Sequence, residues 1–114
     1  MAIEKETNSN IKAGQVRDLA TLVEYSEGAV VSRTLIEKDA GMVTMFAFDK
    51  NQGLSEHTVP FDALVQVLEG EGEFIIGGTS HRVGEAQMLV MPATIPHAVR
   101  ATTRFRMVLT MLRT

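Results

Sequence analysis

The sequence contains no cysteine and no tryptophan, and aromatic residues make up only 5% of its 114 residues. Without cysteine the chain cannot form disulfides, thiolate metal sites or a cysteine nucleophile. The interior must instead be filled by aliphatic side chains and by methionine, which occurs seven times and adapts to irregular spaces. Thiol chemistry is therefore excluded, and an adaptable aliphatic core is expected.

An excess of positive charge is also lacking. The chain has 11 basic and 14 acidic residues, and its isoelectric point is near 5.6. Nucleic acids and anionic membranes attract basic surfaces, so neither is an expected partner. The first ten residues are polar and charged, and no run of about 18 apolar residues occurs. We therefore expect a cytoplasmic protein without a membrane partner.

The length of the chain predicts a single domain. Compact domains cluster near ~100–150 residues, and a composition of 45% hydrophobic residues is enough to fill one core. Residues 1–12 lack apolar periodicity and are expected to form a mobile arm, followed by one domain over residues 13–114. At the start of this domain a short helical turn is expected, with Asp18 as a candidate cap. Its apolar residues are Val16, Leu19, Leu22 and Val23.

Beyond Gly28 the chain consists of short β-branched and aliphatic runs separated by turn residues. The expected strands cover residues 29–37, 42–48, 54–58, 62–69, 72–77, 80–83, 87–91, 97–103 and 105–112. The pair Gly77-Gly78 is the strongest hairpin signal among the turns. This pattern predicts an all-β sandwich or barrel.

Alternation of side chains predicts which strand faces are buried. In the last strand Met107, Leu109 and Met111 share one face, which is expected to point inward, whereas Arg106 lies on the other face. In residues 62–68 both faces are largely apolar, so both need cover. The outer face of that strand is expected to be covered by the N-terminal segment or by a second subunit, and a homodimer is the favoured prediction.

Two of the three histidines lie in segments that carry a family pattern. His57 follows Gly53-Leu54-Ser55-Glu56, and the segment closes with Leu68-Glu69-Gly70-Glu71-Gly72. His97 ends Met91-Pro92-Ala93-Thr94-Ile95-Pro96. In residues 53–72 and 86–101 the sequence resembles the two motifs of the cupin superfamily. The resemblance implies a single-domain jelly-roll barrel, or double-stranded β-helix, with a ligand or metal site inside it.

In the first motif, two expected metal ligands are replaced. Aligned on Gly70, His57 takes the place of the family's first histidine. Val59 stands at the position of the second histidine, and Ala63 at the position of the glutamate. Gly53 also lies closer to His57 than the family's opening glycine does.

The second motif keeps its proline and histidine, at Pro92 and His97. Ala86 and Thr94 stand where the family usually has glycine, and Ala101 replaces its asparagine. What this chain keeps of the family's metal-binding pattern is therefore one histidine in each motif.

A catalytic divalent metal usually has at least three protein ligands. His57 and His97 provide two, so any divalent ion is expected to bind weakly. Asp62 would point inward only if a bulge near Pro60 shifted the strand register. The sequence leaves open whether the protein is an enzyme.

The leading functional hypothesis is a small cupin that binds a small molecule inside the barrel. Its expected pocket is formed by Val59, Ala63, Val65, Met107, Leu109 and Met111, with His57 and His97 as polar groups. One alternative is a metal-dependent enzyme of the dioxygenase or isomerase type that uses the two histidines as ligands. Another is a ligand-sensing or partner module.

Two further residues, Arg33 and His81, carry side chains that could act in a site. Arg33 could anchor a carboxylate if its side chain pointed inward. His81 follows the Gly77-Gly78 turn and is expected to be an exposed hairpin residue. The sequence contains no phosphate-binding loop, no nucleophile elbow and no H-E-x-x-H motif, so phosphoryl transfer and serine hydrolysis have no support.

Overall fold

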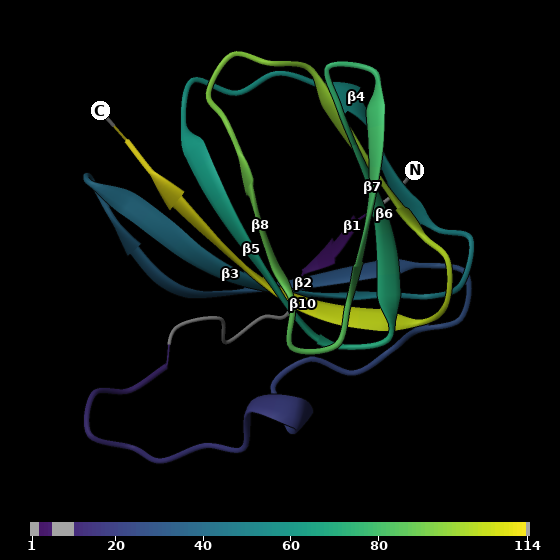
Figure 1. The fold of residues 1–114 in the computed structure, drawn as a ribbon. Helices are drawn as coiled ribbons and strands as arrows, with labels where there is room; N and C mark the ends of the chain where they lie inside the picture. The colour runs from purple at the N-terminus through teal and green to yellow at the C-terminus, as the bar shows by residue number, and fades with distance from the viewer. Residues whose placement is uncertain (1–2, 6–10, 114) are drawn as a thin grey trace.

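The computed structural model describes the backbone of residues 3–5 and the whole of residues 11–113 (Figure 1). A 3-10 turn, η1 (Leu19–Thr21), precedes the main body of strands. The strands are β1 (Ile3–Lys5), β2 (Val30–Lys38), β3 (Gly41–Phe48), β4 (Gly53–His57), β5 (Asp62–Glu69), β6 (Glu71–Ile76), β7 (Thr79–Gly84), β8 (Met88–Met91), β9 (His97–Ala101) and β10 (Phe105–Leu112).

The strands form two sheets that face each other. One sheet has the order β1-β2-β3-β10-β5-β8, and the other has the order β4-β9-β6-β7. The chain passes repeatedly from one sheet to the other, as in a jelly roll, and the sheets enclose the barrel seen in Figure 1. The expected all-β jelly-roll fold is confirmed. No helix in residues 11–113 is long and apolar enough to cross a membrane.

From β2 onward, every strand lies within two residues of its expected bounds. The start of the chain differs from the expectation, because Ile3–Lys5 pair in parallel with Val30, Val31 and Ser32 of β2. These three residues were assigned to a mobile arm because a strand so short leaves no periodicity in the sequence. Residues 1–2 and 6–10 of that arm lie outside the described residues.

The expected helical turn is present as η1, but its cap differs from the prediction. Asp18 stands at the N-cap position, yet its side chain makes no capping hydrogen bond. Its backbone carbonyl accepts hydrogen bonds from the amide and the hydroxyl of Thr21 instead, at 3.2 and 3.1 Å. Val16 and Leu19 are exposed, whereas Leu22 and Val23, just beyond the turn, are buried.

The core between the sheets follows the alternation of the strands. Met107 and Leu109 of β10 are buried in it, and Met111 packs against it, as expected. Ala63, Val65 and Val67 of β5 form its neighbouring row, since β5 pairs with β10. The core is aromatic where β10 begins and β3 ends. The rings of Phe48 and Phe105 are stacked with their centroids 4.5 Å apart, and the ring of Phe74 is edge-on to Phe105. These side chains fill one end of the barrel.

Residues 22–25, which we call the N-terminal strap, cover part of the outer face of the larger sheet. Leu22 and Val23 pack with the buried residues Val31, Met45 and Ala47. Leu68 and Val108, from β5 and β10, border the same cluster. The apolar outer face of β5 is thus partly covered by the N-terminal segment, one of the two covers that the sequence predicts.

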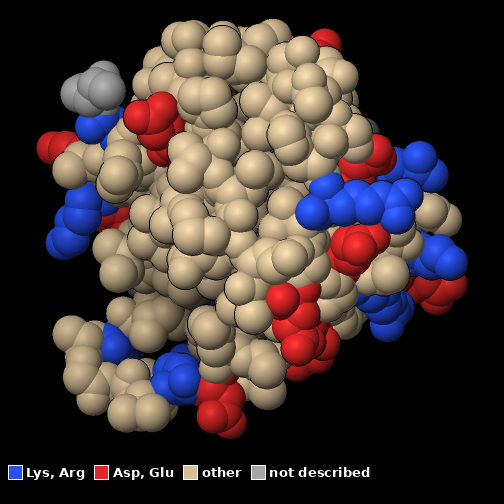
Figure 2. Space-filling view, viewed as in Figure 1, with Lys and Arg blue, Asp and Glu red and all other residues tan. Residues whose placement is uncertain are grey.

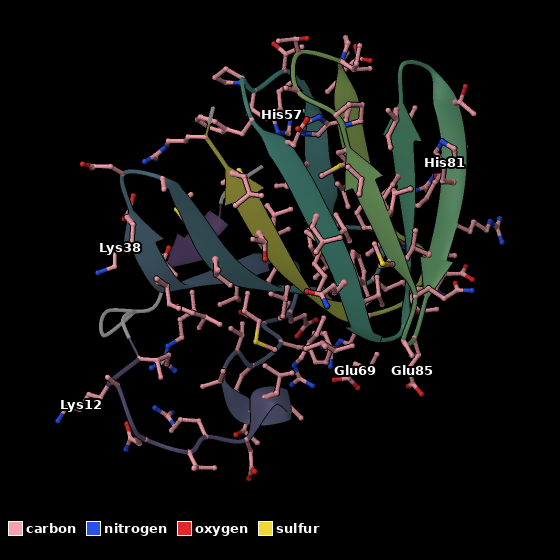
Figure 3. The ribbon with its side chains drawn as sticks, turned by 60° about the vertical axis from the view of Figure 1, so that its left-hand side comes forward. Lys12, Lys38, His57, Glu69, His81 and Glu85 are labelled. Atoms are coloured by element: carbon pink, nitrogen blue, oxygen red, sulfur yellow. The ribbon has the colours of Figure 1, made fainter. Side chains whose placement is uncertain are left out.

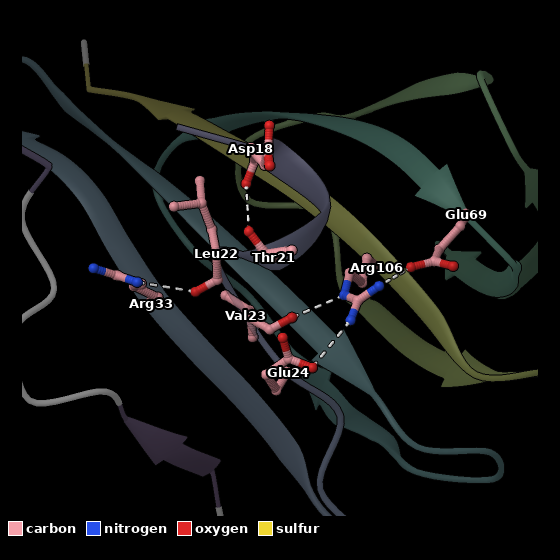
Figure 4. A network of polar contacts seen from close by, with 8 residues as sticks. All are labelled: Asp18, Thr21, Leu22, Val23, Glu24, Arg33, Glu69 and Arg106. Carbon is pink, nitrogen blue, oxygen red and sulfur yellow. Dashed lines mark hydrogen bonds and ion pairs between the residues drawn. The ribbon is translucent and has the colours of Figure 1, made fainter. Parts of the chain in front are cut away.

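Arg106 fastens this strap to the barrel (Figure 4). Its Nε donates to the carbonyl of Val23 at 2.8 Å, its Nη1 bonds Glu69, and its guanidinium lies 4.3 Å from the centre of the Tyr25 ring. Burial and the neighbouring Glu69 carboxylate raise the pKa of Tyr25 to about 12. Arg106 points outward as expected, but the strap buries it.

Arg33 belongs to the same region and not to the barrel interior. Its Nη1 donates to the carbonyl of Leu22 at 3.1 Å (Figure 4). The sequence offered Arg33 as an anchor for a carboxylate only if it pointed inward. On the outer face it holds the N-terminal strap in place instead.

Candidate ligand-binding site

The two motif histidines come together because β4 and β9 are neighbours in the smaller sheet. His57 ends β4 and His97 begins β9, and the register pairs the two residues directly. Their ring centroids are 4.4 Å apart, with an angle of 67° between the ring planes. Gly53 opens β4 where a Cβ would collide with the carbonyl of Val99, so glycine allows the close approach of the two strands.

The histidine pair lies at one end of the barrel. Figure 3 shows His57 at the end opposite to Glu69 and Glu85. His97 is buried and His57 is exposed, so the pair spans the boundary between the interior and solvent. His81 lies apart from them on β7, half-buried and opposite Phe74. It therefore takes no part in this site, although it is less exposed than the sequence suggested.

Both imidazole rings are oriented by backbone carbonyls. Nδ1 of His57 lies 2.7 Å from the carbonyl oxygen of Ser55, and Nδ1 of His97 lies 3.3 Å from that of Ile95. Because a carbonyl oxygen only accepts hydrogen bonds, each Nδ1 is the donor. In the neutral ring the proton is then on Nδ1, and Nε2 carries a free lone pair. Burial, followed by the nearby His57, lowers the pKa of His97 and favours this neutral form.

A cavity of about 630 Å³ opens beside His57. Most of its wall is apolar, and its polar side chains come from the β4 side of the barrel. The lining residues are Phe46, Asn51, Gly53, Leu54, Ser55, His57, Val59, Val99, Leu109 and Met111. The cavity combines an apolar body with a small group of hydrogen-bonding side chains at one edge.

Half of the pocket residues expected from the sequence line this cavity. Val59, Leu109 and Met111 do so. Ala63, Val65 and Met107 point inward but are buried in the core and do not line the cavity, although Ala63 and Val65 pair with Met111 and Leu109. Strand alternation identifies the inward face correctly, but it cannot show which inward side chains stay in contact with open space.

Several lining residues were not expected. Phe46, Leu54 and Val99 form apolar wall, and Asn51 and Ser55 add polar groups. Phe46 has the clearest sequence signal, because it alternates with Phe48 on the inward face of β3. Asn51 lies in a turn at a φ of 70°, and nothing in the sequence pattern indicates which way such a side chain points.

The donor set does not fit a catalytic metal centre. Among residues 11–113, no group of three or more histidine, aspartate or glutamate side chains is placed to hold a metal ion. Val59 and Ala63 have no donor atoms in their side chains. The carboxylate of Asp62 accepts a hydrogen bond from the amide of Ala93 at 2.9 Å, and is thus engaged outside the histidine pair.

Asp62 instead helps to hold the loop that carries His97. The same loop is tied to the connection between β4 and β5 by a hydrogen bond from the amide of Thr94 to the carbonyl of Val59, at 2.9 Å. On its other side the carbonyl of Pro96 accepts from the amide of Gly77 at 2.8 Å. These contacts fix the entry of the chain into β9, and therefore the position of His97.

The family pattern survives in the backbone where the residues have changed. Ala86 and Thr94, the two replacements of glycine in the second motif, have positive φ angles of 63° and 66°. This left-handed conformation suits glycine and strains other residues, above all a β-branched one. The turns have kept the conformation that a glycine would adopt.

The comparisons with known proteins agree with this geometry. The family described as the cupin domain matches residues 44–112. The chain belongs to the cupin superfamily. No curated protein matches it significantly.

Solved structures of other proteins, among them proteins described as cupins, resemble this one over most of its length. A conserved protein of unknown function from Streptococcus pyogenes is 38% identical, with 92% of each chain covered and a TM-score of 0.87. A cupin 2 conserved barrel domain protein from Leptotrichia buccalis is 42% identical over 83% of this cupin and 46% of that chain, with a TM-score of 0.81. A cupin superfamily protein from Desulfitobacterium hafniense is 27% identical, with coverage of 92% and 96% and a TM-score of 0.85.

Proposed function

We propose that this cupin binds a small organic molecule in the cavity beside His57. The observation that carries the proposal is the cavity itself, whose volume of about 630 Å³ lies in the range of known small-molecule sites, ~300–1,000 Å³. Its apolar wall gives a ligand surface to bury, and the polar side chains on one edge can orient it. This is the arrangement that binding requires, without any catalytic step.

A metal-dependent enzyme is the second candidate, because two histidines face each other where the family holds its metal. It lacks a third donor among the described residues, as shown above. We therefore place it second. Elemental analysis of the purified protein distinguishes the two: stoichiometric metal that is lost in His57→Ala would favour the enzyme.

Binding in the cavity can be tested by screening a fragment library against the ¹⁵N-labelled protein by NMR. Bound fragments should shift the amide signals of lining residues such as Leu54, Val59 and Val99. Val59→Trp places an indole at the cavity and should abolish these shifts. Ile36→Trp is the matched control, because Ile36 is exposed on β2 and does not line the cavity, and this variant should bind as the wild type does.

Two results would contradict the proposal. One is a screen in which no fragment shifts the lining residues. The other is binding that persists unchanged in Val59→Trp, which would place the fragments elsewhere on the protein.

A further inference from the structure

The cavity has no charged wall. Among its ten lining residues there is no lysine, arginine, aspartate or glutamate. Figure 2 shows few charged side chains at the end of the molecule that carries the loops before β5 and β9, whereas charged groups gather elsewhere on that face. An ionic ligand would therefore have to leave water without an opposite charge to compensate it.

His57 lines the cavity and can offer a ligand a hydrogen-bond acceptor. Its Nδ1 already donates to the carbonyl of Ser55, so in the neutral ring the atom that carries the free lone pair is Nε2. No side chain or backbone group of the described residues donates to that atom. A ligand in the cavity therefore meets an acceptor whose orientation is fixed before binding.

The hydroxyl of Ser55 can complement this acceptor. Ser55 lines the same cavity two residues before His57, and its hydroxyl can both donate and accept. A ligand hydroxyl can thus donate to Nε2 of His57 and accept from a neighbouring hydroxyl. A carboxylate has no proton to donate and would place its negative charge against the lone pair. An ether has no proton to donate either.

From these observations we infer that the ligand is an uncharged molecule with an apolar body and a hydroxyl group that donates to Nε2 of His57. The inference rests on the proposed function and specifies its ligand class. Apolar contacts with Leu54, Val99 and Leu109 supply the burial, and the hydroxyl fixes the orientation. The class includes phenols and apolar alcohols.

Three probes with the same apolar part test the inference: 4-ethylphenol, 4-ethylanisole and 4-ethylbenzoate. Titrations are followed by NMR at about pH 8, where the phenol is uncharged. The phenol should bind roughly three- to tenfold more tightly than the anisole, the factor expected for one hydrogen bond. The benzoate should bind more weakly than the phenol.

A variant shows whether His57 is the source of this preference. His57→Phe keeps an aromatic ring at an exposed position but removes Nε2. It should remove the preference, so that the phenol and the anisole bind with similar affinity, and anisole shifts at Leu54 and Val99 would show that the cavity still forms. His81→Phe, on β7 and outside the cavity, is the matched control and should keep the preference.

The outcomes separate the inference from the proposed function. If the anisole or the benzoate binds at least as tightly as the phenol, or if His57→Phe keeps the phenol preference, the ligand class is wrong while binding in the cavity stands. If none of the probes shifts the lining residues, both the ligand class and the proposed function fail for molecules of this kind.

Discussion

Thr44 carries the one buried side-chain oxygen in the described part of the chain that has no hydrogen-bond partner. It lies on β3 directly opposite Leu109 and two residues before Phe46, both of which line the cavity. A buried hydroxyl without a partner costs free energy, because it has lost its hydrogen bonds to water. An apolar side chain of the same shape at position 44 should therefore make the protein more stable than Thr44 does.

We expect Thr44→Val to raise the free energy of unfolding by about 1 kcal/mol, because the methyl group replaces the unpaired hydroxyl at nearly the same size. Chemical denaturation measures this change. Thr110→Val, on the outer face of β10 and only partly buried, should change stability by less than about 0.5 kcal/mol. A destabilised Thr44→Val would mean that the hydroxyl has a partner, such as an ordered water.

His97 makes stability depend on pH. Its pKa in the folded protein lies below the ordinary value of 6.5, first because of burial and then because of His57. As pH falls below about 6.5, the unfolded chain takes up a proton that the folded protein resists, so the folded state loses stability. The stability that depends on a neutral His97 is fully present above about pH 6.5 and declines as the pH drops toward the folded pKa.

The denaturant concentration at the unfolding midpoint should therefore decrease as the pH is lowered from neutral toward the folded pKa of His97. His97→Phe should flatten this part of the curve, whereas His81→Phe should leave it unchanged. A wild-type curve with no slope below about pH 6.5 would contradict the assignment.

At the scale of the elements, two turns of the second motif have a glycine-like backbone conformation although their residues are not glycine. Ala86 and Thr94 hold left-handed backbone conformations although neither is glycine. The turn at Thr94 is pinned by its amide to Val59 and by the amide of Ala93 to Asp62. These hydrogen bonds hold the strained conformation in place, because releasing it would break the connection that positions His97.

Thr94→Gly should stabilise the protein by about 1 kcal/mol, since glycine adopts a positive φ without strain. The gain can be measured as an increase in the melting temperature. Thr79→Gly, in the extended strand β7, is the control and should destabilise, because there glycine only adds freedom to the unfolded chain. Equal effects from the two substitutions would show that Thr94 is not strained.

At the scale of the whole molecule, the outer face of the larger sheet is only partly covered. The N-terminal strap packs beside Leu68, whereas Leu64 pairs with Val90 and Gln66 with Met88 farther along the sheet. Met88 and Val90 are 61% and 52% exposed. Monomers rarely leave a contiguous apolar patch of this kind in water, so we expect a second copy of the chain to cover it.

A two-fold dimer through this face would bring Leu64 of both copies close together. Leu64→Glu should therefore dissociate the dimer, because it places two like charges in the interface. Light scattering reports the mass in solution. Ile36→Glu alters another exposed apolar residue, on β2, and should leave the dimer intact. A monomeric wild type, or an unaltered dimer for Leu64→Glu, would contradict the prediction.

The sequence by itself determined the strands from β2 onward and their inward faces, because alternation and turn residues are local signals. The shared site of His57 and His97 was implied by the resemblance to the two cupin motifs. The sequence also determined what the site lacks, because Val59 and Ala63 have no donor atoms whatever the fold.

Only the tertiary structure decided where the cavity lies and what covers the outside. Ala63 and Val65 point inward and pair with Met111 and Leu109, yet they are buried in the core while their partners line the cavity. In the sequence, Arg106 and Arg33 look like surface charges. In the structure both donate hydrogen bonds to carbonyls of the N-terminal strap, which lies across them. Which inward side chains border open space, and which distant segments touch, depends on packing in three dimensions. Alternation along one strand carries no information about either.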